Sequence, residues 1–327
     1  MMKALVLKSE ETPFYYGDWD DPVAGDGEVI VDLKAASLNH RDVFITQGKY
    51  PGIRYPVILG SCGAGMLEGR EVLINPAFDW GDDPRAQSRN FHILGLPRNG
   101  TFAERVAVPL GKVYDKPPHL SWVEAAALPL AGMTAYRAVF SRGQLRTGER
   151  VLISGVGGGV ALFALQFALA AGASVWVTSG HRAKIDRAVE LGAEGGAIYR
   201  EEDWPAQLKE KAGEFDLIID SAGGPGFSHF PRLCRPAARI VTYGGTRGPI
   251  PQLSPQILFW KQLSIMGSTM ATDEEFAAML AFVTDHQLSP VVDQVLPLAA
   301  GRRAFKRMAQ GRQFGKIVLA IDQSLRS

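Results

Sequence analysis

Cysteine is scarce in this chain of 327 residues, occurring only as Cys62 and Cys234. Two cysteines exclude a framework of several disulfides, and they exclude a zinc lobe held by four thiolates. So low a cysteine content is typical of proteins in a reducing compartment, and we expect this one to be cytoplasmic. The N-terminal sequence has too short an apolar stretch for a secretory signal, which fits the same expectation.

An excess of charge of either sign is missing too. The chain has 35 Lys and Arg against 34 Asp and Glu, a formal net charge of +1 at pH 7, which offers no footprint for nucleic acid or an anionic membrane. The uncharged stretch at 151–180 is divided by glycines, and its helical part, about 160–171, is shorter than the roughly 20 residues of a membrane span. We therefore expect a small-molecule substrate, and neither a nucleic-acid nor a membrane partner.

The most informative stretch that is present runs from 151 to 184. An apolar run meets a glycine cluster, followed by an Ala/Leu/Phe segment of helical character and a second apolar run at 175–177. This order predicts the opening of a dinucleotide-binding βαβ unit, in which glycines let the backbone approach a pyrophosphate at the helix N-terminus. The spacing is Gly155-x-x-Gly158-x-x-Ala161 rather than G-x-G-x-x-G, and a purely structural glycine turn is the alternative. The predicted cofactor-binding residues of this turn are Gly155, Gly157, Gly158, Gly159 and Val160.

The end of the second predicted strand indicates which dinucleotide binds. An NAD site usually carries an acid there for the ribose 2′-hydroxyl, but residues 178–184 contain none. Ser179, His181, Arg182 and Lys184 can instead give hydrogen bonds or positive charge to a 2′-phosphate, so the sequence favours NADPH. The alternative is that Arg182 and Lys184 merely solvate the start of a helix.

Alternation of strands and helices continues beyond this unit. Strands are predicted at 215–220, 239–243 and 263–269, with small residues after the first two. Alternation of this kind indicates a parallel sheet covered on both faces, with a ligand crevice at the carboxyl ends of the strands, where Gly244 lies. The first third of the chain is rich in strands and turns. We therefore predict an α/β fold in which a doubly wound parallel sheet is joined to a β-rich domain.

Short motifs are spread over nearly the whole chain. They are Gly27-Glu28-Val29, Leu38-Asn39-His40-Arg41-Asp42, Gly60-x-x-Gly63-Ala64-Gly65, Glu124-Ala125-Ala126-Ala127-Leu128-Pro129, Thr134-Ala135-Tyr136 and Gly315-Lys316-Ile317-Val318-Leu319. With the glycine turn, they resemble the medium-chain dehydrogenase/reductase superfamily. The resemblance implies a GroES-like catalytic domain at 1–125, completed by 268–327, a Rossmann NADP-binding domain at 126–267 that includes Thr134, and an active site in the cleft. It also implies a homodimer.

Zinc-dependent members of that superfamily have a cysteine where this chain has Asn39, and a His-Glu pair where it has Ser61 and Cys62. A catalytic zinc needs three N, S or carboxylate ligands, and an amide and a hydroxyl are poor substitutes. The segment corresponding to the structural zinc lobe, 75–100, has no cysteine. We expect neither metal to be present. A site built from Cys62, His40 and His92 is the alternative.

The sequence is more similar to the zinc-free branch, the quinone oxidoreductases and enoyl reductases. That branch has a Leu-Asn-x-x-Asp motif, matched by Asn39 and Asp42, and some of its enoyl reductases use a tyrosine acid, matched by Tyr50. Several NADPH-binding members place a tyrosine on the 2′-phosphate, and Tyr199 is similar. Asp220 is predicted to be a structural hydrogen-bond acceptor, and the basic run at 302–307 a solvated helix face.

The resulting hypothesis is an NADPH-dependent, zinc-independent oxidoreductase that reduces a quinone or the activated C=C of an α,β-unsaturated carbonyl. Without a metal, neutral donors can stabilise charge on the acceptor's carbonyl oxygen, and Asn39 and Tyr50 are the predicted catalytic residues. Tyr50 is alternatively a wall residue stacking on the nicotinamide. Two other functions stay open: a zinc-dependent alcohol dehydrogenase with altered ligands, and a non-catalytic NADPH-binding sensor or structural protein. The sequence does not distinguish a quinone from an enone, enal or thioester.

Overall fold

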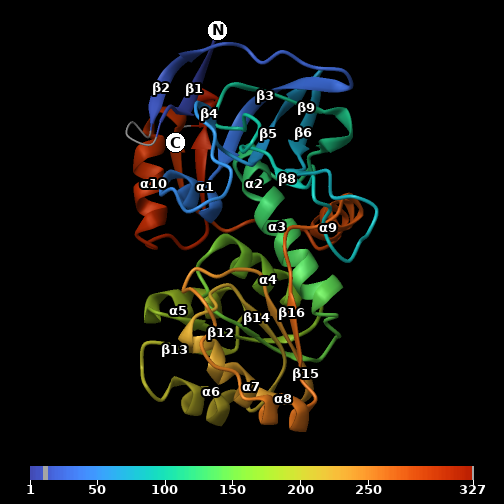
Figure 1. The fold of residues 1–327 in the computed structure, drawn as a ribbon, viewed down its shortest axis with the longest axis vertical. Helices are drawn as coiled ribbons and strands as arrows, with labels where there is room; N and C mark the ends of the chain where they lie inside the picture. The colour runs from blue at the N-terminus through green and yellow to red at the C-terminus, as the bar shows by residue number, and fades with distance from the viewer. Residues whose placement is uncertain (10–13, 326–327) are drawn as a thin grey trace. The chain divides into compact units, whose positions relative to one another are not determined.

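The computed structural model describes residues 1–9 and 14–325 (Figure 1). The chain forms two compact units: a first unit of residues 1–131 and 272–327, and a second unit of residues 132–271. Strands and helices alternate in the second unit, whereas strands dominate the first. The predicted α/β fold class is therefore confirmed.

The second unit contains a six-stranded sheet in which every paired strand is parallel. Its strands in spatial order are β13 (Gly195–Ile198), β12 (Ser174–Ser179), β11 (Arg150–Ile153), β14 (Phe215–Asp220), β15 (Cys234–Thr242) and β16 (Ser264–Gly267). Numbered along the chain this is 3-2-1-4-5-6, the order of the dinucleotide-binding Rossmann fold. The order reverses at β11, so the crevice for a ligand is expected beyond the end of that strand.

Helices connect these parallel strands. They are α4 (Gly159–Ala170), α5 (Arg182–Glu190), α6 (Trp204–Ala212), α7 (Phe230–Leu233) and α8 (Pro255–Lys261), with a 3₁₀ turn η3 (Pro225–His229). Helix α4 is buried along most of its length because its Ala, Leu and Phe residues meet the core on several sides. Helix α5 is amphipathic, and only Ile185 and Ala188 are buried.

The first unit is organised around the long strand β3 (Glu28–Ser37). Its main sheet has the order β10 (Val113–Asp115), β6 (Arg70–Ile74), β5 (Cys62–Leu67), β3, β18 (Lys316–Ala320) and β17 (Val292–Pro297), with β9 (Arg105–Pro109) also paired to β3. Smaller sheets are formed by β2 (Tyr15–Trp19), β1 (Met2–Leu7) and β4 (Val57–Ile58), and by β7 (Ala77–Phe78) and β8 (His92–Ile93). Because β18 pairs directly with β3, the end of the chain completes this unit.

The helices of the first unit are α1 (His40–Thr46), α2 (Trp122–Ala127), α3 (Pro129–Tyr136, which continues into the second unit), α9 (Asp273–Asp285) and α10 (Gly301–Ala309), with 3₁₀ turns η1 (Leu110–Lys112), η4 (Leu298–Ala300) and η5 (Gln323–Leu325). Three of them, α1, α2 and α9, begin at capping boxes. The capping boxes of α2 and α9 are formed by Ser121 with Glu124 and by Thr272 with Glu275. None of the helices in the described ranges is long and apolar enough to cross a bilayer.

Three segments have irregular local structure. Thr101 and Phe102 lie outside the β9 ladder, because their N–H groups donate to the carbonyls of Gly60 and Leu59. The segment 77–100 is largely irregular but contains the short pair β7 and β8. Helix α3 changes after Tyr136 into a π-helix, η2 (Arg137–Arg142).

Candidate active site

The candidate catalytic region of the first unit begins where β3 gives way to α1. Asn39 is the N-cap of α1 and has extended backbone angles, φ −126° and ψ 158°. Its backbone N–H donates to Asp42 Oδ2 at 2.8 Å, and Asp42 is completely buried. The acid three residues into the helix therefore fixes the turn that holds Asn39, which explains the spacing of the Asn39 to Asp42 motif.

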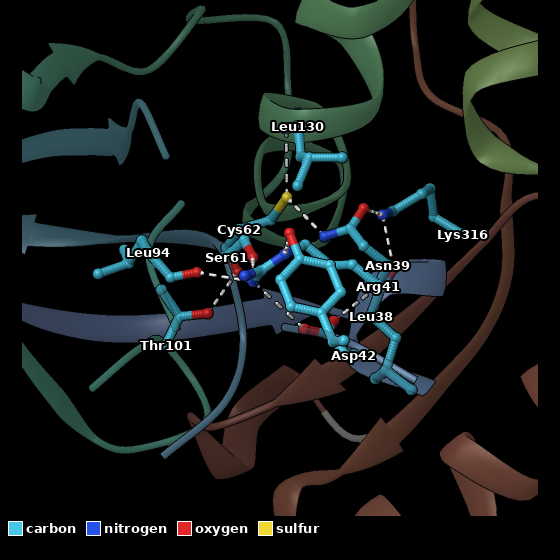
Figure 2. Close-up of polar contacts among 11 residues, drawn as sticks. Leu38, Asn39, Arg41, Asp42, Ser61, Cys62, Leu94, Thr101, Leu130 and Lys316 are labelled. Atoms are coloured by element: carbon cyan, nitrogen blue, oxygen red, sulfur yellow. Dashed lines mark hydrogen bonds and ion pairs between the residues drawn. The ribbon is translucent and has the colours of Figure 1, made fainter. Parts of the chain in front are cut away.

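Both polar atoms of the Asn39 side chain have protein partners (Figure 2). Lys316 Nζ donates to Asn39 Oδ1 at 2.6 Å and to the Leu38 carbonyl at 2.6 Å. Asn39 Nδ2 donates to Cys62 Sγ at 3.2 Å, and the same sulfur accepts the backbone N–H of Leu130 at 3.2 Å. An ammonium can only donate, so Oδ1 must face Lys316, and the NH₂ group has one further N–H with no partner in the described part of the chain.

Arg41 fills the other side of this region (Figure 2). Its Nη1 donates to Ser61 Oγ at 2.8 Å and to the Leu94 carbonyl at 3.1 Å. The guanidinium carbon lies 5.0 Å from the centre of the Tyr50 ring, and Nε is 3.5 Å from the Tyr50 hydroxyl. Arg41 is 8% exposed, and its Nη2 has no hydrogen-bond partner within the described part of the chain. A largely buried cation therefore lies against Tyr50.

The charges of this region do not cancel. Arg41 and Lys316 are cations, and Asp42 is the carboxyl beside them, with its Oδ1 3.9 Å from Arg41 Nη1. Burial raises the pKa of Asp42, against the opposing effect of Arg41. Burial also lowers the pKa of Lys316, against the opposing effects of Cys62 and Asp42. With all three groups ionised, the cluster has one positive charge in excess, which favours negative charge on a nearby ligand atom.

The glycine turn of the second unit follows β11, as the sequence predicts. Gly155 and Gly157 have φ of +66° and +125°, which L side chains rarely adopt. A Cβ at Gly157 would lie 2.9 Å from Lys184 Cδ and 3.2 Å from its Nζ, so the Lys184 side chain lies over the turn. A Cβ at Gly158 would meet nothing within 4 Å, which leaves open space at the N-terminus of α4. Gly159 and Val160 form the first turn of that helix.

The predicted 2′-phosphate residues differ in their surroundings. Ser179 is buried, and its Oγ accepts the His181 backbone N–H at 3.4 Å, whereas the side chain of His181 is exposed. Arg182 Nε donates to Asp186 at 2.8 Å on the exposed face of α5. A Cβ at Gly180 would lie 2.8 Å from the Tyr199 hydroxyl, so Tyr199 reaches back across the end of β12. The structure therefore places the Tyr199 hydroxyl at the end of β12. Arg182 instead forms an ion pair within α5.

Thr134, Gly244 and Asp220 are the remaining residues of the second unit for which the sequence predicts a role. Thr134 is buried, with its Oγ1 3.8 Å from Met270 Sδ. A Cβ at Gly244 would lie 2.5 Å from the Ser221 carbonyl oxygen, so the loop after β15 requires a glycine there. Asp220 accepts hydrogen bonds from the Ser154 hydroxyl and the Gly223 N–H, as expected of a structural acceptor.

Two sequence-family profiles match the chain. The alcohol dehydrogenase GroES-like domain matches residues 25–118, and the zinc-binding dehydrogenase family matches residues 159–285. A zinc-type alcohol dehydrogenase-like protein YogA from Leptosphaeria maculans is 31% identical over 92% of this chain and 92% of its own length. The chain belongs to the medium-chain dehydrogenase/reductase superfamily.

Other members of the superfamily differ in cofactor and reaction. An acryloyl-coenzyme A reductase from Sulfurisphaera tokodaii is 28% identical over 97% of this chain and 99% of its own. A crystal structure of an NAD-dependent alcohol dehydrogenase has a TM-score of 0.92 and 35% identity, covering 98% of this chain and 100% of that one. The quinone oxidoreductase from Thermus thermophilus, solved with NADPH, has a TM-score of 0.83 and 30% identity, with the same coverage. Membership alone therefore does not determine the cofactor.

The superfamily includes zinc enzymes, and this chain's residues do not fit a catalytic zinc. At the two substituted ligand positions, Asn39 binds the ammonium of Lys316 and Ser61 binds the guanidinium of Arg41, so a cation already lies against each oxygen. The alternative ligands do not converge: His92 stacks on Phe78, and the His40 ring contacts Phe44. Among residues 1–9 and 14–325, no three His, Cys, Asp or Glu side chains are grouped to hold a metal.

Three functional candidates were missed from sequence. Arg200 Nε lies 2.9 Å from the position of a Cβ at Gly180, next to the Tyr199 hydroxyl, and Arg200 has no partner among the residues described. Its position directly after Tyr199 could have marked it in the sequence as a second candidate for binding the 2′-phosphate. Arg41 and Lys316 were noted only as parts of motifs. Nothing in their spacing predicts that two cations so distant in sequence converge on Asn39 and Ser61.

Proposed function

We propose that this protein is an NADPH-dependent, zinc-independent oxidoreductase that reduces a quinone or the activated C=C of an α,β-unsaturated carbonyl. The observation that carries the proposal is the pair of cations, Lys316 and Arg41, bound to Asn39 and Ser61, where a zinc enzyme would need ligands. Donors and positive charge suit a carbonyl oxygen that becomes negative during reduction. The acryloyl-coenzyme A reductase and quinone oxidoreductase relatives support this choice of reaction.

The second unit has the features that NADPH requires. The open space at Gly158 and the α4 N-terminus suits a pyrophosphate, and Lys184 adds positive charge over the same turn. Tyr199 and Arg200 follow β13, and their side chains lie beside Gly180 at the end of β12, where they offer a hydroxyl and a guanidinium to a 2′-phosphate. Residues 178–184 present no acid to repel it. Bound NADPH would supply a hydride to the electron-poor carbon of the acceptor.

The first unit would bind and activate the acceptor. The remaining N–H of Asn39 Nδ2 is placed to donate to the acceptor's carbonyl oxygen, which takes the C=C π electrons when the β-carbon accepts the hydride. One proton must then reach the α-carbon, or a quinone oxygen, and the Tyr50 hydroxyl beside Arg41 is the proposed donor. Solvent returns the proton to Tyr50, so the residue is regenerated in each cycle.

The test is NADPH oxidation by the purified protein against a panel of quinones, enones, enals and enoyl thioesters, with product analysis. Reduction of at least one acceptor class is expected, with the carbonyl of an enone retained in the product. Tight NADPH binding without turnover on any class would favour a non-catalytic sensor. Oxidation of simple alcohols that depends on added zinc would favour a zinc-dependent dehydrogenase.

We also propose a homodimer formed through the second unit. Strand β16 is the edge of its sheet, and the preceding helix α8 exposes two adjacent aromatic side chains, Phe259 at 60% and Trp260 at 79%. Exposed aromatic pairs beside a free strand edge are typical of interaction surfaces. Light scattering after size-exclusion chromatography would measure the mass, and a monomer at micromolar concentration would refute the proposal.

A further inference from the structure

Lys316 is the most deeply buried cation of the candidate active site. It is 3% exposed and is the first residue of β18. Gly315 precedes it with φ +113°, and a Cβ at that glycine would lie 2.3 Å from the Val291 carbonyl oxygen. The Lys316 N–H donates to that same carbonyl at 2.8 Å. The close backbone approach permitted by glycine thus sets the start of β18, and the Lys316 ammonium reaches Asn39, the N-cap of α1.

Burying an ammonium group removes its hydration, which destabilises the folded state unless hydrogen bonds within the protein replace those to water. Here it has two short ones, to the Leu38 carbonyl and to Asn39 Oδ1. The second bond makes a chain of donors: Lys316 donates to the amide oxygen, and the amide nitrogen donates onward to Cys62. Hydrogen bonds arranged in series polarise one another, so the ammonium strengthens the N–H groups of Asn39 as donors.

We propose that Lys316 is a positioning residue that orients and polarises the Asn39 amide, so that its free N–H binds the acceptor's carbonyl oxygen as that oxygen becomes negative. The inference rests on the proposed function. Through the amide, Lys316 supplies part of the positive charge that a metal supplies in zinc enzymes, and it exchanges no proton with the substrate. Reduction of the carbonyl compound therefore needs Lys316 in its ammonium form.

The pH dependence separates this role from a structural one. Burial lowers the pKa of Lys316 below its ordinary value of 10.5, so the unfolded chain binds more protons than the folded chain between the two pKa values. In that window the contribution of Lys316 to stability rises with pH, whereas its activation of Asn39 is lost. A falling kcat with a rising contribution to stability is the expected signature.

Two titratable groups act on Lys316 directly, Asp42 on α1 and Cys62 on β5. Several charged groups on the elements packed against β18 are bound elsewhere: Glu124 to Ser121, Asp293 to Arg307, Lys34 to Asp322 and Glu28 to Arg98. Asp32 on β3 and Arg302, Arg303 and Lys306 on α10 are exposed to solvent. The alkaline limb assigned to Lys316 must therefore be absent from a variant that lacks only this ammonium.

The experiment compares Lys316→Met with Lys112→Met. Lys112 is a matched control because it also lies in the first unit, is 13% exposed and binds a partner, Asp273, at 2.6 Å. Lys316→Met should lower kcat for the best acceptor about 10- to 100-fold, as expected for a residue that orients a directly acting group, and should abolish the alkaline limb. The Kd for NADPH should be unchanged, and Lys112→Met should change only stability. Equal kcat in the two variants, or an alkaline limb that survives Lys316→Met, would overturn the inference.

A second readout does not depend on turnover. The absorbance of bound 4-nitrophenol reports whether this carbonyl mimic is ionised, and wild type should hold a larger ionised fraction than Lys316→Met. If wild type reduces no acceptor, the proposed function fails while this probe still tests Lys316. If Lys316→Met does not fold, Lys316→Arg decides: arginine keeps a cation that does not titrate in this range, so an alkaline limb that survives in this variant would refute the role.

Discussion

The two units prepare their sites in different ways. In the second unit the candidate cofactor site is largely backbone: glycines at φ +66° and +125°, a helix N-terminus and a strand end. In the first unit the candidate catalytic site is made of side chains that bind one another, with Asn39 between Lys316 and Cys62. A backbone site depends on glycine's backbone angles and on the space that glycine leaves for the cofactor, whereas a side-chain network depends on the charge of each member. Single substitutions in the two units should therefore differ in what they disturb.

Gly157→Val should have the largest effect, because it adds a side chain at φ +125° where a Cβ already approaches Lys184. Strain and obstruction of the turn should raise the Kd for NADPH at least about 100-fold. The measurement is a fluorescence titration with NADPH. Gly172→Ala is the control, since its φ of +79° also strains alanine but it lies at the other end of α4. Equal loss of NADPH affinity in both variants would contradict a backbone-built site.

Tyr50→Phe removes the proposed proton donor and keeps the ring that faces Arg41. General acid catalysis contributes about 100-fold or more, so kcat should fall by at least about 10-fold while the acceptor's KM changes little. Steady-state kinetics with one enone and one quinone would measure both constants. Unchanged turnover would make Tyr50 a wall residue and remove it from the mechanism.

Arg200→Gln should have a moderate and selective effect. Losing one charge-assisted contact to the 2′-phosphate should raise the KM for NADPH roughly 10-fold and leave that for NADH unchanged. Arg182→Gln is the control, because Arg182 is paired with Asp186, and it should change the NADPH constant much less. The reverse ranking of the two arginines would assign the phosphate to α5 rather than to the end of β13.

The smallest effect on catalysis is expected at the exposed aromatic pair. Replacing Phe259 and Trp260 together by serine should convert the proposed dimer to a monomer, while kcat per chain stays close to wild type. Light scattering and the standard assay would follow the two properties. An unchanged mass would show that α8 is not the contact surface.

Prediction from sequence was most successful for motifs whose residue types fix the local backbone geometry. The glycine turn, the parallel sheet and the capping boxes at Ser121 and Thr272 follow from local rules, and the structure has all of them. Asn39 and Asp42 were also found together, since the acid caps the turn that holds the asparagine.

The partners of Asn39 were beyond sequence reasoning. Lys316 is 277 residues away and reaches Asn39 only because β18 pairs with β3. Arg41 meets Ser61, 20 residues away in the sequence, only through tertiary contact. Arg182 shows the opposite error, a basic residue beside the predicted site that binds its own helix. Side-chain direction depends on tertiary packing, which local spacing does not determine.

The central claim is that cations and an amide replace the metal, and it is tested most directly by turnover of a metal-free preparation. The protein would be stripped with a chelator, shown by elemental analysis to lack zinc, and assayed for NADPH-dependent reduction of its best enone or quinone. We expect the same kcat before and after stripping, and no gain when zinc is returned. Activity that disappears with the metal and returns with one zinc per chain would contradict the claim.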